Sequence, residues 1–530
     1  MSYFENNIWS KNEYHTLGRK ENDQAGKSII GSIVVGIFLI LLVISLWNIG
    51  RHNLSKTYVV IIDTNSNLLH KTSERYLSFG LDSSLLRDMD KFPVKNDTFV
   101  NLARYLSPAF VRVGGTSADC IFFNQPVPEV TEKITSPVDA QDISNFTLAG
   151  DDYLAVYQFT ERAQLRMMFD LNALIRDPDD HWDDTNAKDI INFSKGHSMD
   201  IDWQLGNEPN SFRHVFNRPV SAKQLADDYI HLRRLLNQLG YETSFLVGPE
   251  VNHIGDNDKA GEKYATEFLK NNENSVDFLT WHQYYLNGRE AKVADFINPN
   301  VFNRLPIQIK NVQDVIDQTN KNLKMWMSET STAYGGGAPE LSNRFVAGFL
   351  WLDKLGYGAT AGVDVIVRQS FFGGNYSMIG KDLEPNPDWW VSVMYKQFVS
   401  SKVIQLKTPS NFGSIRLYGH CTCPSALISR VPAITVYGVN LNNDFVRISL
   451  LYYLKSYPRK NSKSFLYILT ADYLQSRDIR LNGEILKLNS DGSLPAFKPV
   501  IVDSSQVITL PPFSMAFIIM HGVEHRACET

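Results

Sequence analysis

The chain has 530 residues, of which 43% are hydrophobic and 21% are charged. This is the composition of an ordinary globular protein, and it excludes a disordered chain, a collagen and a small disulfide scaffold. The 52 basic and 57 acidic residues give a formal net charge of −5. The chain as a whole therefore offers no attraction to polyanions, and nucleic acid is excluded from the predicted partners.

The first distinctive segment is an uncharged apolar run at residues 28–50. As a helix, this run exceeds the roughly 30 Å of a bilayer core, and it is longer than the about 7–15 apolar residues of a secretory signal peptide. We therefore predict a transmembrane signal anchor, with a cleaved signal as the alternative. Basic residues before the run favour a cytoplasmic tail at residues 1–27. This predicts a single-pass type II membrane protein with a lumenal or extracellular remainder, or a lysosomal or secreted form after cleavage.

Two other features test this placement. Five Asn-x-Ser/Thr sequons are candidate glycosylation sites: Asn53, Asn96, Asn145, Asn192 and Asn375. The four cysteines are too few for a disulfide framework, and their spacing does not match a zinc site. One long-range disulfide in an oxidising compartment is the better interpretation, and we predict no metal.

Beyond the apolar run, eight short apolar segments recur, and each ends in polar or glycine-rich sequence: 76–81, 110–113, 165–171, 201–205, 244–247, 277–281, 323–327 and 363–367. They are largely continuous rather than alternating, which is typical of strands buried on both faces. Helix-like segments such as 222–239 lie between several of them. This pattern predicts an α/β fold with a (β/α)8 TIM barrel over residues 73–398. A doubly wound open sheet is the alternative, but no nucleotide-binding loop supports it.

The character of the sequence changes near residue 400. Short strand-like runs separated by Asn, Gly, Pro and Ser predict an antiparallel β domain over residues 399–530. The β-rich stretch at residues 57–72, before the first barrel strand, is predicted to contribute a strand to this domain.

Two glutamates stand where a barrel places its chemistry, at the carboxyl ends of strands. Glu208 follows the fourth apolar segment in the sequence WQLGNEPN, and Glu329 follows the seventh in WMSET. Two carboxyls across a cleft suit glycoside hydrolysis, in which one donates a proton and the other attacks the anomeric carbon or activates water. A glutamate that only complements a helix dipole is the alternative for each. A separation of about 5–5.5 Å would indicate retention, and about 6.5–9.5 Å would indicate inversion.

Aromatic and glycine-rich segments accompany the pair. The rings at residues 281–285 suit stacking on sugars or orienting Glu329, whereas filling of the barrel is the alternative, above all for Tyr285. The three glycines at residues 335–337 allow close approach of backbone to a ligand, and a flexible loop is the alternative.

These segments resemble the heparanases, the retaining endo-β-glucuronidases of glycoside hydrolase family 79. The resemblance extends from about residue 57 to the C-terminus and is carried by Gly114-Gly115-Thr116 and residues 203–212, 281–289, 328–339 and 368–376. It implies a (β/α)8 barrel with a β-sandwich, heparan sulfate as the glycosaminoglycan substrate and no cofactor.

The resemblance also implies roles for individual residues. Glu208 would be the acid/base, Glu329 the nucleophile and Asn207 a partner of the sugar 2-hydroxyl. The implied saccharide-binding set is Asp82, Thr116, Asn207, His282, Tyr284, Tyr334, Gly335, Gly336, Gln369, Gly374 and Tyr376. A disulfide between Cys421 and Cys528 is implied as well, and Cys120 and Cys423 have no counterpart.

Three features depart from the heparanases. Residues 125–150 are short where heparanases carry a linker excised on maturation, so a two-chain form is not expected. The loop at residues 249–259 is more acidic than basic, and it would repel a highly sulfated chain. The third departure is the predicted anchor.

Residues 282–285 and 384–389 resemble the leech-type hyaluronidases of the same family slightly more closely. Hyaluronan therefore remains an alternative substrate, and a non-catalytic glycosaminoglycan-binding homologue remains the third possibility.

Overall fold

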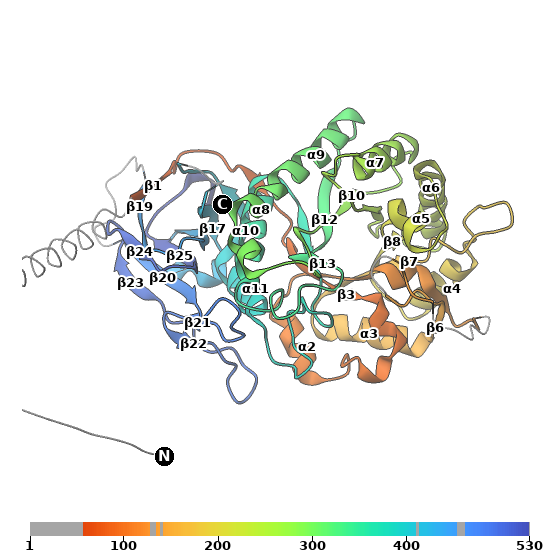
Figure 1. Ribbon diagram of the computed structural model, residues 1–530, viewed down its shortest axis with the longest axis horizontal. Helices are drawn as coiled ribbons and strands as arrows, with labels where there is room; N and C mark the ends of the chain where they lie inside the picture. The colour runs from red at the N-terminus through yellow and green to blue at the C-terminus, as the bar shows by residue number, and fades with distance from the viewer. Residues whose placement is uncertain (1–56, 128–133, 138–140, 410–412, 453–461, 529–530) are drawn as a thin grey trace, which may run out of the picture. The chain divides into compact units, whose positions relative to one another are not determined.

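Eight parallel strands form the central sheet of the chain (Figure 1). The computed structural model describes residues 57–127, 134–137, 141–409, 413–452 and 462–528. The strands follow one another around the sheet in chain order, and a bridge between Trp203 and Leu246 links β8 to the start of β9. The sheet is therefore a nearly closed barrel, and this prediction is confirmed. Its strands are β3 (Leu77–Asp82), β4 (Phe110–Gly114), β7 (Arg166–Leu171), β8 (Ile201–Leu205), β9 (Val247–Val251), β10 (Phe278–Gln283), β12 (Lys324–Thr330) and β14 (Val365–Arg368).

Helices connect the successive strands and cover the outside of the barrel (Figure 1). The sequence of α6 shows why such a helix forms: Ser221 and Gln224 make a capping box at its start, and Leu232 and Leu236 lie on its buried face. The helices are α2 (Asp97–Arg104), α3 (Gly150–Arg162), α4 (Thr185–Gly196), α5 (Phe212–Val215), α6 (Ala222–Gln238), α7 (Ala260–Asn271), α8 (Pro299–Phe302), α9 (Arg304–Gln318), α10 (Ala347–Thr360) and α11 (Pro387–Phe398). Two short strand pairs lie in the loops: β5 (Ile121–Phe123) with β6 (Phe146–Leu148), and β11 (Leu286–Asn287) with β13 (Ala333–Tyr334).

One predicted strand is displaced along the chain from the observed one. The predicted segment spans residues 244–247, whereas β9 starts at Val247 and continues through Gly248, Pro249 and Glu250. Gly-Pro usually marks a turn, which is why the sequence places the end of this strand too early. Glu250 is consequently a strand residue whose side chain is fully buried.

Two further sheets pack face to face around a second apolar core. The smaller sheet contains β16 (Leu406–Lys407), β1 (Thr57–Ile62), β19 (Val446–Tyr452) and β24 (Ile508–Leu510). The larger sheet contains β2 (His70–Lys71), β15 (Val399–Ile404), β17 (Ile415–Thr422), β18 (Ala433–Asn440), β25 (Ser514–His521), β20 (Lys463–Thr470), β21 (Arg480–Leu481), β22 (Glu484–Ile485) and β23 (Val500–Asp503). The stretch at 57–72 thus supplies β1 to one sheet and β2 to the other.

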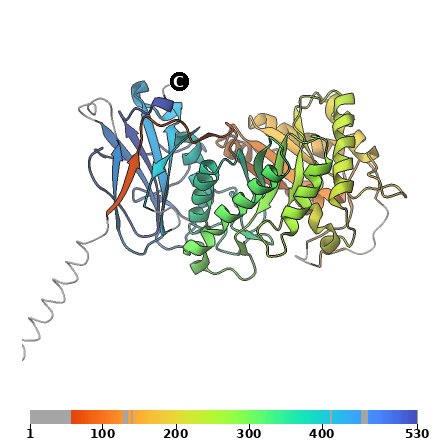
Figure 2. The same ribbon diagram turned by 90° about the horizontal axis from the view of Figure 1, so that it is seen from above.

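The pairing of β1 differs from a purely antiparallel β domain. Strand β1 lies parallel to β19, with Val60 opposite Leu450, and its red ribbon lies among the blue C-terminal strands in Figure 2. A parallel pair needs a long connection between its strands, and the whole barrel sequence supplies that connection.

Buried polar contacts join the barrel to the larger of these sheets. Tyr418 on β17 donates its hydroxyl to Asp353 on α10 at 2.6 Å, and Arg416 approaches the same carboxylate at 3.5 Å. Gly356 on α10 lies against the ring of Tyr418 so closely that a Cβ there would stand 1.9 Å from the ring. Cys421 on β17 forms a disulfide with Cys528, and Cys120 and Cys423 are free.

The prediction of a transmembrane helix is corrected. In residues 57–528, apart from the undescribed gaps, no helix is both long and apolar enough to cross a bilayer. The segment at 28–50, on which the prediction was based, and the tail at 1–27 lie outside the described residues. The described residues therefore do not support the predicted membrane helix, the membrane as a partner or the type II location.

Candidate active site

The interior of the barrel changes from apolar to polar along its strands. One apolar layer is formed by Phe110, Met168, Val247, Trp326, Val365 and Val367. Side chains on a strand alternate between two faces, so residues two positions apart point to the same side. Arg112 therefore lies on the same side of its strand as Phe110, and Asp170 lies on the same side as Met168. All four side chains are buried. A buried polar layer thus lies on the carboxyl-end side of the apolar layer.

A cleft of about 710 Å³ opens above this polar layer, at the carboxyl ends of the strands. Every predicted catalytic or saccharide-binding residue except Gly374 lines it: Asp82, Thr116, Asn207, Glu208, His282, Tyr284, Glu329, Tyr334, Gly335, Gly336, Gln369 and Tyr376. Gly374 lies against the ring of Tyr376, where an added Cβ would be 2.7 Å from Cε2. The structure therefore gathers residues from all parts of the barrel sequence into one cleft.

The two glutamates face each other in this cleft. One carboxylate oxygen of Glu208, one of Glu329 and a ring nitrogen of His282 all lie within 4.8 Å of one another. Glu208 follows β8 and has a left-handed backbone with φ of 54°, whereas Glu329 is a residue of β12. The side chain of Glu208 is 23% exposed and that of Glu329 is 11% exposed, so both are accessible from the cleft.

His282 connects the cleft to the buried layer. Its Nδ1 lies 2.8 Å from Oε1 of Glu208, and its Nε2 lies 2.8 Å from Oε2 of Glu250. Burial lowers the pKa of His282, but the charge of Glu329 and the hydrogen bonds to Glu208 and Glu250 outweigh burial and raise that pKa to about 10. His282 is then an imidazolium that donates from both nitrogens. A protonated nitrogen has no lone pair for a metal, so the spacing of this cluster fits proton chemistry better than metal binding.

Glu329 is held by two donors. Nη1 of Arg112 donates to Oε2 at 2.7 Å, and the hydroxyl of Tyr284 donates to Oε1 at 2.7 Å. Burial and then the charge of Glu329 raise the pKa of Tyr284 well above its ordinary value, so this phenol remains a neutral donor. Arg112 carries a permanent charge against the same carboxylate, and the pKa of Arg112 is raised because nearby acids outweigh its burial.

Glu250 is a buried acid that the sequence did not single out. It accepts from Ser328 at 2.9 Å and from Gln204 at 2.6 Å, and it lies 3.1 Å from Arg112. Burial raises the pKa of Glu250, but Arg112 and His282 together hold it below its ordinary value. The sequence carries the same signal here as for Glu208, an acid three residues after an apolar segment, but it does not show that Glu250 is a buried strand residue.

Asn207 is fixed from two sides. Its side-chain Oδ1 accepts from Nη2 of Arg112 at 2.8 Å, and its backbone N–H donates to Asp119 at 2.8 Å. Since the oxygen end is taken, the Nδ2 end is the part of the amide that can donate to a ligand. Burial raises the pKa of Asp119 to about 7, against the lowering effect of the backbone N–H groups of Asn207 and Ala173.

The glycine loop presents its backbone to the cleft. Gly335 and Gly336 have φ values of 72° and 82°, and an added Cβ on either would meet no atom within 4 Å. Glycine adopts this left-handed backbone without strain, and the open space on its flank lets a ligand approach the peptide groups. The neighbouring Tyr334 is 52% exposed. At the ends of the neighbouring strands β14 and β3, Gln369 donates to Asp82 at 2.9 Å, and burial raises the pKa of Asp82.

The charge of the cleft is mostly negative. Among the described residues that line it, Arg289 is the one lysine or arginine, whereas Asp82 and Asp256 join the two glutamates as acids. This agrees with the acidic loop seen in the sequence.

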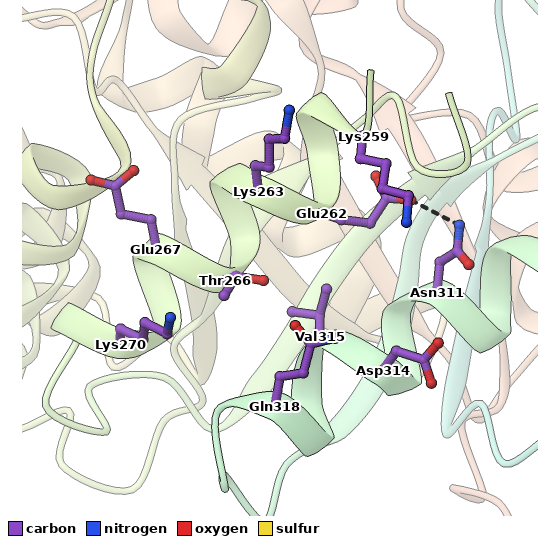
Figure 3. A pocket seen from close by; sticks show the side chains of 10 residues that line it. All are labelled: Lys259, Glu262, Lys263, Thr266, Glu267, Lys270, Asn311, Asp314, Val315 and Gln318. Atoms are coloured by element: carbon purple, nitrogen blue, oxygen red, sulfur yellow. Dashed lines mark hydrogen bonds between the residues drawn. The ribbon is translucent and has the colours of Figure 1, made fainter. Parts of the chain in front are cut away.

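A second cavity, of about 420 Å³, lies between α7 and α9 on the outside of the barrel (Figure 3). Lysines and acids of opposite charge share its walls, and Asn311 donates to Glu262 at 2.8 Å within it. It has no facing pair of carboxyls, so it lacks the chemistry of the main cleft.

The sequons lie on the surface where they are described. Asn96 caps α2 by accepting from the backbone of Thr98 at 2.8 Å, which leaves its amide nitrogen available. The exposed sequon asparagines are Asn96, Asn145, Asn192 and Asn375. Asn375 lies beside the cleft, where its backbone N–H donates to Gly336. Asn53 lies outside the described residues.

Comparison with known proteins adds independent findings. A family model described as "Glycosyl hydrolase family 79, N-terminal domain" matches residues 78–356. The "Heparanase" of Gallus gallus is 34% identical over 497 residues, which cover 86% of this chain and 94% of that protein. The "Hyaluronoglucuronidase" of Hirudo nipponia is 29% identical over 511 residues, which cover 89% of this chain and 100% of that protein. The solved structure of a 4-O-α-L-rhamnosyl-β-D-glucuronidase from Fusarium oxysporum 12S matches with a TM-score of 0.63 at 13% identity, over 87% of this chain and 100% of that one, and this likeness shows the fold alone.

Proposed function

The chain belongs to glycosyl hydrolase family 79 and is a glycoside hydrolase, and from this premise we propose that it is a retaining endo-β-glucuronidase acting on a glycosaminoglycan. Heparan sulfate is the proposed substrate, and hyaluronan is the second candidate. Glu208 is the proposed acid/base and Glu329 the proposed nucleophile.

One observation carries the proposal of retention. Oxygens of Glu208 and Glu329 lie within 4.8 Å of each other. Retaining enzymes hold their carboxyls about 5–5.5 Å apart, whereas inverting enzymes need about 6.5–9.5 Å to admit a water. The short separation supports direct attack by one carboxylate on the anomeric carbon.

The contacts of the two glutamates support the division of roles. Glu329 faces the permanent cation of Arg112 and the neutral hydroxyl of Tyr284, which stabilise an ionised nucleophile. Glu208 is more exposed, and one of its oxygens faces the neutral amide of Asn252. Its other oxygen faces the imidazolium of His282. The greater exposure of Glu208 gives the leaving group and the attacking water access to it, which a group that releases and takes up a proton requires.

The reaction then proceeds in two displacements. Glu208 gives its proton to the glycosidic oxygen while Glu329 attacks the anomeric carbon, so the leaving alcohol departs and a glycosyl ester forms. Glu208, now a carboxylate, takes a proton from a water whose oxygen attacks the same carbon. Glu329 leaves as a carboxylate, and both groups return to their starting states.

The remaining walls of the cleft suit a glucuronide. The Nδ2 group of Asn207 can donate to the sugar 2-hydroxyl, because its Oδ1 is already bound by Arg112. The peptide groups of Gly335 and Gly336 and the hydroxyl of Tyr376 line the same wall. Such neutral donors can hold a uronate carboxylate without any cofactor.

The charge of the cleft is the reason to retain hyaluronan as the second candidate. Arg289 is the one lysine or arginine among the described lining residues, and the imidazolium of His282 already faces Glu208 and Glu250, whereas Asp82 and Asp256 are acids. This lining disfavours closely spaced sulfates. Heparan sulfate of low sulfation, or unsulfated hyaluronan, is therefore the preferred substrate.

The test is the Glu329→Gln variant, assayed on heparan sulfate and hyaluronan with the products separated by size. We expect the wild type to shorten one polymer from within its chain and the variant to lose at least about 10³-fold in rate, with an unchanged unfolding curve. Glu161→Gln, an exposed glutamate on α3, is the matched control. Undiminished activity of Glu329→Gln would refute the assignment. A polymer that is retained on a column but never shortened would instead indicate a binding protein.

A further inference from the structure

Asn252 is a residue of the cleft that the proposed mechanism has not used. It follows β9, and its side-chain Nδ2 donates to Oε2 of Glu208 at 2.7 Å. The other end of the same amide, Oδ1, accepts from the hydroxyl of Ser211 at 3.0 Å. Each end of the amide therefore has one partner, and both partners line the cleft.

The backbone around Asn252 is fixed independently of its side chain. The backbone N–H of Asn252 donates to Oδ1 of Asn210 at 3.2 Å, and its carbonyl accepts from Nδ2 of Asn210 at 3.2 Å. This reciprocal pair anchors Asn252 to the turn that directly follows Glu208. The amide can thus turn about its own axis while its position beside Glu208 is maintained.

Glu208 can use only one of its oxygens to exchange a proton with the cleft. Oε1 faces Nδ1 of the cationic His282 at 2.8 Å, and this donor contact suits a carboxylate oxygen or the carbonyl oxygen of an acid equally well. The proton of the acid form therefore belongs on Oε2, which is the oxygen that faces Asn252. An amide donor in that place suits the carboxylate, but an acid needs an acceptor there.

We propose that the side chain of Asn252 is a two-state positioning group that donates to Glu208 when it is a carboxylate and, after a half turn of the amide, accepts the proton of Glu208 when it is an acid. This inference rests on the proposed double displacement, in which Glu208 alternates between these forms. Ser211 matches both orientations, because a hydroxyl can donate to Oδ1 or accept from Nδ2. No bond between heavy atoms forms or breaks in the turn.

Other ionisable groups surround the cleft in which the amide turns, and substitution of Asn252 leaves them unchanged. Those that face Glu208 or line the same cleft are Asp82, His214, His253, Asp256, His282, Tyr284, Arg289, Glu329, Tyr334 and Tyr376. None of them contacts the amide of Asn252 through a hydrogen bond that the structure describes. A change at Asn252 therefore acts on Glu208 first.

The informative variant is Asn252→Asp, which keeps the shape of the side chain but replaces the donor end with an oxygen. A second carboxylate beside Oε2 favours the acid form of Glu208. We expect the alkaline limb of the kcat/KM profile on the polymer to move up by about one pH unit. On an aryl glucuronide whose activated leaving group needs no proton, Glu208 acts only as the base, so we expect the acidic limb of the kcat profile to move up by a similar amount.

Asn210→Ala is the matched control, because it removes the backbone anchor and leaves the contact between Asn252 and Glu208. A structural role for Asn252 predicts that both variants lower the rate at every pH by a common factor. An Asn252→Asp profile with both limbs at the wild-type pH values would overturn the inference. Failure of the proposed function is distinguishable, since the wild type would then cleave neither the polymer nor the aryl glucuronide.

Discussion

The buried carboxylate of Glu250 offers the sharpest test of the charge network under the cleft. Replacement by glutamine keeps the size of the side chain and removes one negative charge. In the folded protein, Glu250 accepts from Nε2 of His282 at 2.8 Å and lies 3.1 Å from Arg112. Both cations therefore lose a buried partner, while Glu208 still faces the other nitrogen of His282.

The magnitude follows from the raised pKa of His282. A pKa of about 10 in place of 6.5 corresponds to about 5 kcal/mol in favour of the imidazolium. Glu250 is one of three carboxylates that produce this effect against the cost of burial, so its loss removes about 2 kcal/mol of it and lowers the pKa of His282. This is less than the about 3–5 kcal/mol that follows from breaking a buried pair, because the other carboxylates remain.

The sign of the pH dependence is fixed by the direction of the shift. A raised pKa in the folded state stabilises the protein fully below the unfolded value of about 6.5, and that stability is lost as the pH rises through the folded pKa. In the wild type this loss extends to about pH 10, whereas in Glu250→Gln it is complete about 1.5 pH units earlier. Glu250 has a lowered pKa of its own, so its contribution is constant above pH 6 and does not alter the shape.

The assay is urea unfolding between pH 6 and pH 10, followed by tryptophan fluorescence. The free energy of unfolding of Glu250→Gln should lie below that of the wild type at every pH, and this deficit should be about 2 kcal/mol larger at pH 6 than near pH 10. Glu161→Gln serves as the surface control for the same chemical change. If Glu250→Gln and the wild type differ by the same free energy at every pH, His282 does not owe its charge to Glu250 and the reasoning is refuted.

Two further substitutions test other parts of the molecule. Gly356→Ala on α10 would place a Cβ within 1.9 Å of the ring of Tyr418, so we expect about 1–3 kcal/mol of destabilisation in thermal unfolding, whereas Gly196→Ala, with no atom within 4 Å of its Cβ position, should be neutral or stabilising. Equal effects of the two would contradict the tight packing of α10. Glu208→Ala should hydrolyse polymer at least about 10²-fold more slowly and recover turnover with azide on an aryl glucuronide, giving a product of retained anomeric configuration. An inverted product would exclude the proposed double displacement.

Much of the barrel could be predicted from the sequence because its strands are buried on both faces. Continuous apolar segments followed by polar loops are visible without any knowledge of partners. Strand β9 is the exception, since Gly248 and Pro249 continue a strand where they usually end one. Because the strand extends past the proline, the side chain of Glu250 is buried in the barrel, which the sequence does not show.

Some residues of the candidate site could likewise be predicted from the sequence, and others could not. Glu208 and Glu329 were recognisable because strand ends in a barrel converge on one face. Arg112 was not, because an arginine within an apolar segment carries no sign of its partners, which come from four other strands or strand ends. Asn252 was not recognised for a similar reason. A short polar loop residue becomes informative only when the structure shows its contact, here with Glu208.

The parallel pairing of β1 with β19 has a consequence for synthesis of the chain. Strand β1 is made early, yet its partner emerges only after roughly 400 further residues. At about 5–20 residues per second, the ribosome needs about 20–80 s to supply that partner. During this interval the apolar side chains of Val60 and Ile62, which are buried in the finished sheet, have no place to pack. The barrel can close before the sandwich is complete, so a nascent chain of this protein carries β1 without its β19 partner for most of its time on the ribosome.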